Sequence, residues 1–109
     1  MHRSTRVVGD LGVIHIDGEV DTTHAPTLRE AAERLLGDGA RSLVIDCRGI
    51  EFIDSAGLQA LVQSYKAAQA RGGTVTVRDP SEFTLKLLRL SGLDEVLLID
   101  DPTQLEHGA

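Results

Sequence analysis

The chain has 109 residues, of which 41% are hydrophobic and 26% are charged, a composition that indicates one folded domain and not a disordered segment. Its 17 acidic residues outnumber 11 basic ones and give a formal charge of −6 at pH 7. An acidic surface repels phosphate backbones, and an aromatic content of 3% offers few stacking platforms, so we expect no nucleic-acid partner. The single cysteine, Cys47, excludes an internal disulfide and a multi-cysteine metal site.

No stretch of the sequence approaches the roughly 18 apolar residues of a membrane span. The first six residues are not followed by the apolar run of a secretory signal. We therefore expect a cytoplasmic protein that does not insert into membranes.

Strands and helices alternate along the chain. Two short apolar runs, residues 7–8 and 13–16, flank a Gly/Asp-containing turn at residues 9–12, which predicts two antiparallel strands. Beyond a polar loop, apolar residues recur at helical spacing over residues 28–36, and Gly37 ends that helix.

The middle of the chain repeats the pattern. Residues 43–46 form a compact apolar run typical of a strand covered on both faces, and residues 48–53 are expected to be a connection. A helix is predicted to begin at Asp54 or Ser55 and to end at residues 72–73. Its buried stripe is expected to comprise Leu58, Leu61, Val62, Tyr65 and Ala68.

The last third predicts a strand over residues 74–78, a helix opened by residues 79–81 and a strand over residues 96–99. Gly92 is expected to close the helix, and residues 100–109 are expected to form a short tail that frays. The inner face of this helix is predicted to carry Phe83, Leu87, Leu88 and Leu90.

This order predicts a single α/β domain over residues 1–109 with its core at about residues 7–99. Its sheet is expected to be mixed but mostly parallel, with about five strands and three to four helices. The residues expected to be mostly buried are Leu43, Val44, Ile45, Leu61, Val62, Val75, Val77, Leu87 and Leu97.

Two polar loops are candidates for a functional site. Residues 21–24 follow the second strand, and residues 54–57 open the second helix. In an open parallel sheet, sites gather at the loops that follow the carboxyl ends of the strands, so these two loops are expected to lie close together.

Ser55 admits two interpretations. Asp54 or Ser55 caps the helix, which alone explains both residues and is the commoner case. Alternatively, Ser55 accepts a phosphate, since the free N–H groups and the dipole of a helix N-terminus favour an anion.

An enzyme remains an alternative at this point. Ser55, His24 and either Asp21 or Asp54 resemble a nucleophile with its base and orienting carboxylate. However, the Gly-x-Ser-x-Gly elbow is absent, because Ile53 precedes Ser55 by two residues. A metal held by His24 and Asp21 lacks further ligands, and no cofactor motif occurs.

The stretch from Val44 to Leu58 resembles the signature of the STAS domain, the family of bacterial anti-sigma factor antagonists: a strand ending in Asp46, a Gly-containing connection, an apolar pair and then Asp-Ser-x-Gly-Leu. Residues 18–21 with 25–28 resemble a second marked stretch of that family, and residues 91–96 resemble its end. The resemblance covers residues 7–99.

The resemblance implies a protein without enzymatic activity or cofactor that binds an anti-sigma factor and so frees a sigma factor. That anti-sigma factor is also an ATP-dependent serine kinase. It would phosphorylate Ser55 and end the binding, and a phosphatase would restore it. The free protein is expected to be a monomer. The residues expected at the partner interface are Asp21, Thr22, Thr23, His24, Asp54, Ala56, Gly57 and Gln59.

Three positions depart from the family pattern. Ala56 replaces a frequent second serine, His24 stands where Thr or Asn is common, and Gln59 replaces a usual small residue. Two alternatives stay open: an accessory STAS subunit of a stress-sensing or lipid-transport complex, and a small serine hydrolase.

Overall fold

The computed structural model describes residues 1–101. Within that range, helices and strands alternate as the sequence predicts. The elements in chain order are β1 (His2–Val8), β2 (Leu11–Val20), α1 (Ala25–Gly37), β3 (Ser42–Ile53), α2 (Ser55–Gln69), β4 (Val75–Arg78), α3 (Glu82–Leu90), the short 3-10 helix η1 (Leu93–Glu95) and β5 (Leu98–Asp100).

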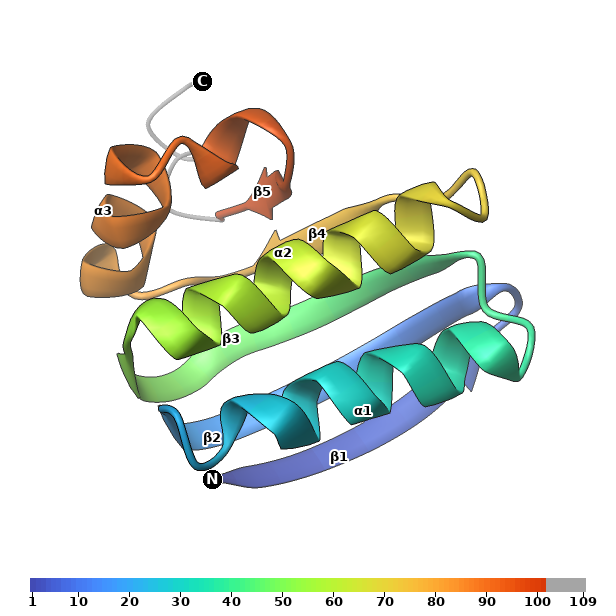
Figure 1. The fold of residues 1–109 in the computed structure, drawn as a ribbon, viewed down its shortest axis with the longest axis horizontal. Coiled ribbons are helices and arrows are strands. Elements are labelled where there is room, and N and C mark those ends of the chain that lie inside the picture. Colours follow the sequence, from blue (N-terminus) through green and yellow to red (C-terminus); the bar gives the residue numbers. More distant parts are fainter. Residues whose placement is uncertain (102–109) are drawn as a thin grey trace.

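The strands form one sheet in the order β1-β2-β3-β4-β5 (Figure 1). β1 runs antiparallel to β2, and every following pair is parallel. The mixed, mostly parallel sheet predicted from the sequence is therefore confirmed. Within the described range, no helix is long and apolar enough to cross a membrane.

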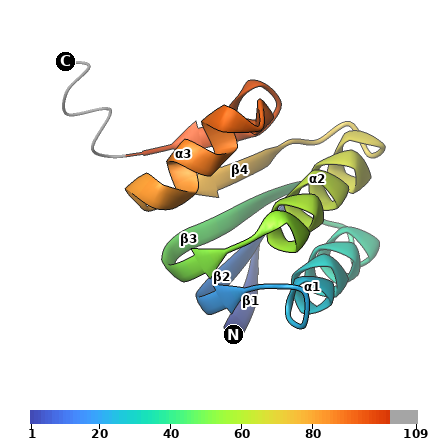
Figure 2. The same cartoon turned by 60° about the vertical axis from the view of Figure 1, so that its left-hand side comes forward.

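The core lies between the sheet and two helices. α1 and α2 lie side by side over one face of β2 and β3 (Figure 2). Leu28 of α1, Leu61 of α2 and Ile45 of β3 are completely buried there. Burial at the core is confirmed for Leu43, Ile45, Leu61, Val75, Val77 and Leu97, whereas Val44, Val62 and Leu87 are half-buried.

β3 is longer than predicted. It continues through the stretch expected to be a connection and ends at Ile53. Its pairing with β2 shifts register twice, between His15 and Asp17 and between Gly18 and Glu19. These irregularities break the alternation of apolar and polar residues, so the sequence pattern predicts a loop where the ladder in fact continues.

The inner face of α3 was predicted correctly at Leu88 and wrongly at Phe83 and Leu90. Its buried residues are Thr84, Leu85 and Leu88, whereas Phe83 is 51% exposed and Leu90 is 75% exposed. α3 is a helix of nine residues that lies on the β4–β5 side of the sheet, away from α1 (Figures 1 and 2). The spacing of its apolar residues fits two adjacent faces, and only the packing decides between them.

The ends of the fold also differ from the prediction. β1 begins at His2 although all of its residues are exposed, because backbone pairing with β2 and not burial holds this edge strand. At the other end β5 covers Leu98–Asp100, later than expected, because at the end of η1 the N–H groups of Val96 and Leu97 donate to the carbonyl of Leu93. Most of the predicted tail, residues 102–109, lies outside the described residues.

Candidate functional site

The two polar loops meet at one edge of the sheet. Val20 and Ile53, the last residues of β2 and β3, are direct neighbours in the parallel ladder. The backbone N–H of Asp54 donates to the carbonyl of Val20 at 3.4 Å. The loop before α1 and the start of α2 are therefore adjacent, as the sequence predicts.

Asp54 caps α2. Its carboxylate oxygen Oδ1 accepts hydrogen bonds from the backbone N–H groups of Ala56 at 2.9 Å and Gly57 at 3.1 Å. Ser55 follows as the first residue of the helix and is exposed. Among the described residues nothing hydrogen-bonds to the Ser55 hydroxyl. Capping is thus assigned to Asp54, and the Ser55 oxygen is available at the positive end of the helix dipole.

Gly57 fixes the position of this helix start. A Cβ atom at Gly57 would collide with the carbonyl oxygen of Val20 and would lie 2.5 Å from Cγ1 of Ile53. Neighbouring backbone therefore approaches this glycine closely. Because Gly57 is buried, we assign it to the placement of Ser55 and not to direct contact with a partner.

Asp21 and His24 form a pair in the neighbouring loop. The Nδ1 atom of His24 lies 2.7 Å from Oδ1 of Asp21, and the backbone N–H of His24 donates to the same oxygen at 3.1 Å. Partial desolvation pulls the pKa of the Asp21 carboxyl upward, but the hydrogen bonds from His24 and Thr23 and the attraction of His24 outweigh it, so this pKa lies below its ordinary value. Asp21 is therefore an anion at neutral pH.

The same pair bears on the hydrolase alternative. His24 and Asp21 have the orientation that a base and its carboxylate need, but no hydrogen bond joins His24 to Ser55 in the described part of the chain. The link between nucleophile and base that defines this kind of active site is missing. Among residues 1–101, no three His, Cys, Asp or Glu side chains come together as metal ligands either.

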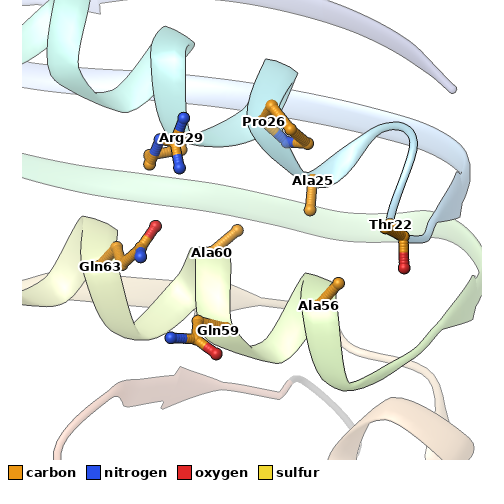
Figure 3. Close-up of a pocket in the computed structure, with 8 residues that line it drawn as sticks. All are labelled: Thr22, Ala25, Pro26, Arg29, Ala56, Gln59, Ala60 and Gln63. Atoms are coloured by element: carbon orange, nitrogen blue, oxygen red, sulfur yellow. The ribbon is translucent and has the colours of Figure 1, made fainter.

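A groove between α1 and α2 begins at Ala56, the residue that follows Ser55 (Figure 3). Its volume is about 250 Å³. Thr22 and Ala56 lie at one end of it, and Arg29 and Gln63 lie at the other. Its remaining lining residues are Ala25, Pro26, Gln59 and Ala60.

Comparison with known proteins identifies the fold and the family. The family model described as "Mlab, STAS domain" matches residues 4–100. Over 84 residues, which are 77% of this chain and 76% of the relative, the sequence is 32% identical to the anti-sigma-B factor antagonist of Bacillus subtilis strain 168. The chain belongs to the STAS-domain family. The resemblance stated from the sequence motifs is thereby confirmed.

Solved structures agree with this assignment. The anti-sigma factor antagonist SpoIIAA in its unphosphorylated form superposes with a TM-score of 0.80 at 20% identity, covering 95% of this chain and 92% of that one. Phosphorylated SpoIIAA of Bacillus superposes with a TM-score of 0.73 at 19% identity, covering 97% of each chain. Both similarities establish the STAS fold.

Of the eight predicted interface residues in this STAS domain, Thr22, Ala56 and Gln59 line the groove. Asp21, Thr23 and His24 belong to the adjoining loop, residues 21–24. Both threonines of that loop, Thr22 and Thr23, are exposed. The sequence analysis missed Arg29 and Gln63, because their place in the groove depends on how α1 packs against α2. The sequence did contain one signal for the groove. Ala56 and Ala60 are four residues apart on one helix, and so are Gln59 and Gln63.

Two further reactive groups lie away from this site. Cys47 is completely buried, and burial, with the neighbouring charge of Asp46, raises the pKa of its thiol to about 12. Cys47 is therefore a small buried core residue. His15 is half-buried on the sheet, with Nδ1 2.9 Å from Oδ2 of Asp46.

Proposed function

We propose that this STAS domain is an anti-sigma factor antagonist switched off by phosphorylation of Ser55. In the active state it binds an anti-sigma factor that is also a serine kinase, and a sigma factor is released. ATP belongs to the kinase, and a phosphatase acting on phosphorylated Ser55 resets the switch. The antagonist itself performs no catalysis and needs no cofactor.

The exposed Ser55 hydroxyl is the observation that carries this proposal. Because Asp54 supplies the cap, a phosphate on Ser55 removes no hydrogen bond that the fold needs. Asp54 already accepts the N–H groups of Ala56 and Gly57, so the feature that favours the added anion is the dipole of α2. The relatives support the same assignment, since one bears the name anti-sigma-B factor antagonist and SpoIIAA occurs in unphosphorylated and phosphorylated forms.

We expect phosphorylation to lower the affinity for the partner. Phosphate adds about −1.5 to −2 charges at neutral pH, and it joins Asp21 and Asp54 on a domain whose formal charge is already −6. A partner that covers a neutral hydroxyl must then desolvate an anion among like charges. Such arrangements cost several kcal/mol, which corresponds to an affinity loss of a hundredfold or more.

The test begins with capture of partners on the purified domain and mass spectrometry, which identify the anti-sigma factor and the modification of Ser55. Calorimetry then measures the affinity of that anti-sigma factor for the wild type, Ser55→Ala, Ser55→Asp and the phosphorylated protein. Ser4→Asp is the matched control, since Ser4 is an exposed serine on β1, away from the site.

We expect the wild type, Ser55→Ala and Ser4→Asp to bind alike, and Ser55→Asp and the phosphorylated protein to bind at least tenfold more weakly with unchanged circular dichroism. Equal affinities across all five proteins would contradict the switch. Capture of transporter subunits or a sensory complex in place of an anti-sigma factor would favour the accessory-subunit alternative. Ester hydrolysis that is lost in Ser55→Ala would favour the hydrolase.

A further inference from the structure

The α1–α2 groove is electrically asymmetric. At one end lie Thr22 and Ala56, which in the sequence closely follow the carboxylates of Asp21 and Asp54. The far end holds Arg29 (Figure 3). Arg29 is the only charged residue among the described residues that line the groove. A localised cation on a domain of formal charge −6 marks the point where an anionic group of a partner is favoured.

The Arg29 guanidinium is available for such a group. The acid nearest to it is Glu33, one turn along α1, whose Oε1 lies 3.9 Å from Nε of Arg29. That separation is too long for a hydrogen bond, and the two side chains are 42% and 61% exposed. Exposed pairs of this kind contribute little, so a carboxylate that approaches Arg29 loses little to competition from Glu33.

The rest of the groove suits a short stretch of polypeptide. Ala25, Ala56 and Ala60 are small, and Gln63 adds an amide beside Arg29 (Figure 3). Ala56 and Gln63 are seven residues apart on α2, and a helix rises about 1.5 Å per residue, so the groove extends along α2 for about 10 Å. An extended segment of about three residues covers that distance.

We propose that this groove receives an acidic segment of the anti-sigma factor, with an Asp or Glu carboxylate bound by the Arg29 guanidinium. The inference rests on the proposed function and names the chemistry of the partner surface that lies next to Ser55. Guanidinium and carboxylate match in a two-bond geometry that an ammonium group does not reproduce. Arg29 thus determines which partner docks, and Ser55 determines when it docks.

Distance separates these two roles. Ser55 lies eight residues before Gln63, about 12 Å along α2, which exceeds the screening length of about 8 Å at physiological ionic strength. A phosphate on Ser55 therefore acts only weakly on a carboxylate held at Arg29. The effects of Arg29 and Ser55 substitutions on affinity are expected to be additive.

The test uses the anti-sigma factor identified by capture, with calorimetry on the full-length domain. Arg29→Gln removes the charge, and Arg29→Glu reverses it. Arg29→Lys keeps the charge but not the two-bond geometry of the guanidinium. Arg34→Gln and Arg34→Glu are the matched controls, because Arg34 is exposed in the last turn of the same helix and does not line the groove.

We expect Arg29→Gln to lose about 10- to 100-fold in affinity, as for removal of one partner of a charged hydrogen-bonded pair. Arg29→Glu should lose more, Arg29→Lys should lose less, and both Arg34 variants should stay within twofold. The loss in Arg29→Gln should shrink between 0.1 M and 1 M salt. A reversed charge on the matching acidic residue of the anti-sigma factor should restore binding to Arg29→Glu.

The outcomes separate this inference from the proposed function. If the wild type binds and Ser55→Asp does not, but the Arg29 variants bind like the Arg34 controls, the inference is overturned and the proposed function stands. If the wild type binds no anti-sigma factor, the proposed function fails and the inference fails with it. If the Arg29 variants change self-association in sedimentation and leave anti-sigma binding intact, the groove holds a second copy of this chain and the inference is likewise overturned.

Discussion

Asp54 and Ser55 are adjacent but have separate roles. Asp54 caps α2, and Ser55 presents an exposed hydroxyl at the start of the same helix. The Asp54 carboxylate satisfies two backbone N–H groups of α2, which leaves the Ser55 hydroxyl outside the hydrogen-bonding of the helix. Under the proposed function, a phosphate on Ser55 therefore removes no hydrogen bond that caps α2.

This division predicts unequal effects on stability. Asp54→Ala should lower the free energy of unfolding by about 0.5–2 kcal/mol, as for loss of a helix cap, whereas Ser55→Ala should change it by less than about 0.5 kcal/mol, as for an exposed site. Urea titration of the two variants checks this. A larger loss in Ser55→Ala than in Asp54→Ala would mean that the serine is the true cap.

Asp21 and His24 allow a test by titration. The hydrogen bonds from His24 lower the pKa of Asp21, so His24→Ala should raise this pKa toward its ordinary value of about 3.9. Ionised Asp21 stabilises the folded state above the pKa of the unfolded chain, and that contribution is lost as the pH falls through the lower folded pKa.

NMR titration of the Asp21 carboxyl carbon between pH 2 and 6 measures the shift directly. His2→Ala is the control, because His2 lies exposed on β1 and its removal should leave the Asp21 titration unchanged. An identical Asp21 midpoint in His24→Ala and in the wild type would show that the pair in this loop has no electrostatic role.

At the scale of secondary-structure elements, α2 and α3 show how burial decides what an apolar residue contributes. Leu61 of α2 is completely buried, whereas Leu90 of α3 is 75% exposed. Leu61→Ala should therefore lower the free energy of unfolding by about 2–5 kcal/mol, and Leu90→Ala should lower it by no more than about 0.5 kcal/mol.

Both substitutions replace leucine with alanine in a helix, so the difference between them isolates packing from helix propensity. Denaturant titration of the two variants provides the comparison. A cost at Leu90 that equals the cost at Leu61 would place Phe83 and Leu90 on a buried face of α3, as the sequence pattern alone predicts.

At the scale of the whole molecule, much of the architecture could be predicted from the sequence, because the residues that build the core also carry the pattern. The apolar run at residues 43–45 and the helical stripe containing Leu61 each have one arrangement that buries most of their side chains. The face of α3 could not be predicted, because Phe83 and Leu90 are apolar but lie where the sheet offers no cover. The start of β1 is held by backbone pairing, which leaves no trace in side-chain polarity.

Some residues of the candidate site could likewise be predicted from the sequence, and others could not. Asp21, Asp54 and Ser55 stand in local motifs at strand ends, so sequence reasoning finds them and topology brings them together. Arg29 stands in the middle of an ordinary amphipathic helix, and nothing within α1 distinguishes it from Arg34. Its role depends on the neighbouring helix, which is information that only the folded structure contains.

The ladder contact between Val20 and Ile53 also affects the rate at which a partner is expected to bind. Both loops of the site start from strand ends that are already joined, and Gly57 holds the start of α2 against Val20. These two loops are therefore preformed, and association is expected at the ordinary rate for such surfaces, about 10⁵–10⁷ M⁻¹s⁻¹. Under the proposed function, the speed of the switch is then set by how quickly the complex dissociates and how quickly phosphate is added or removed.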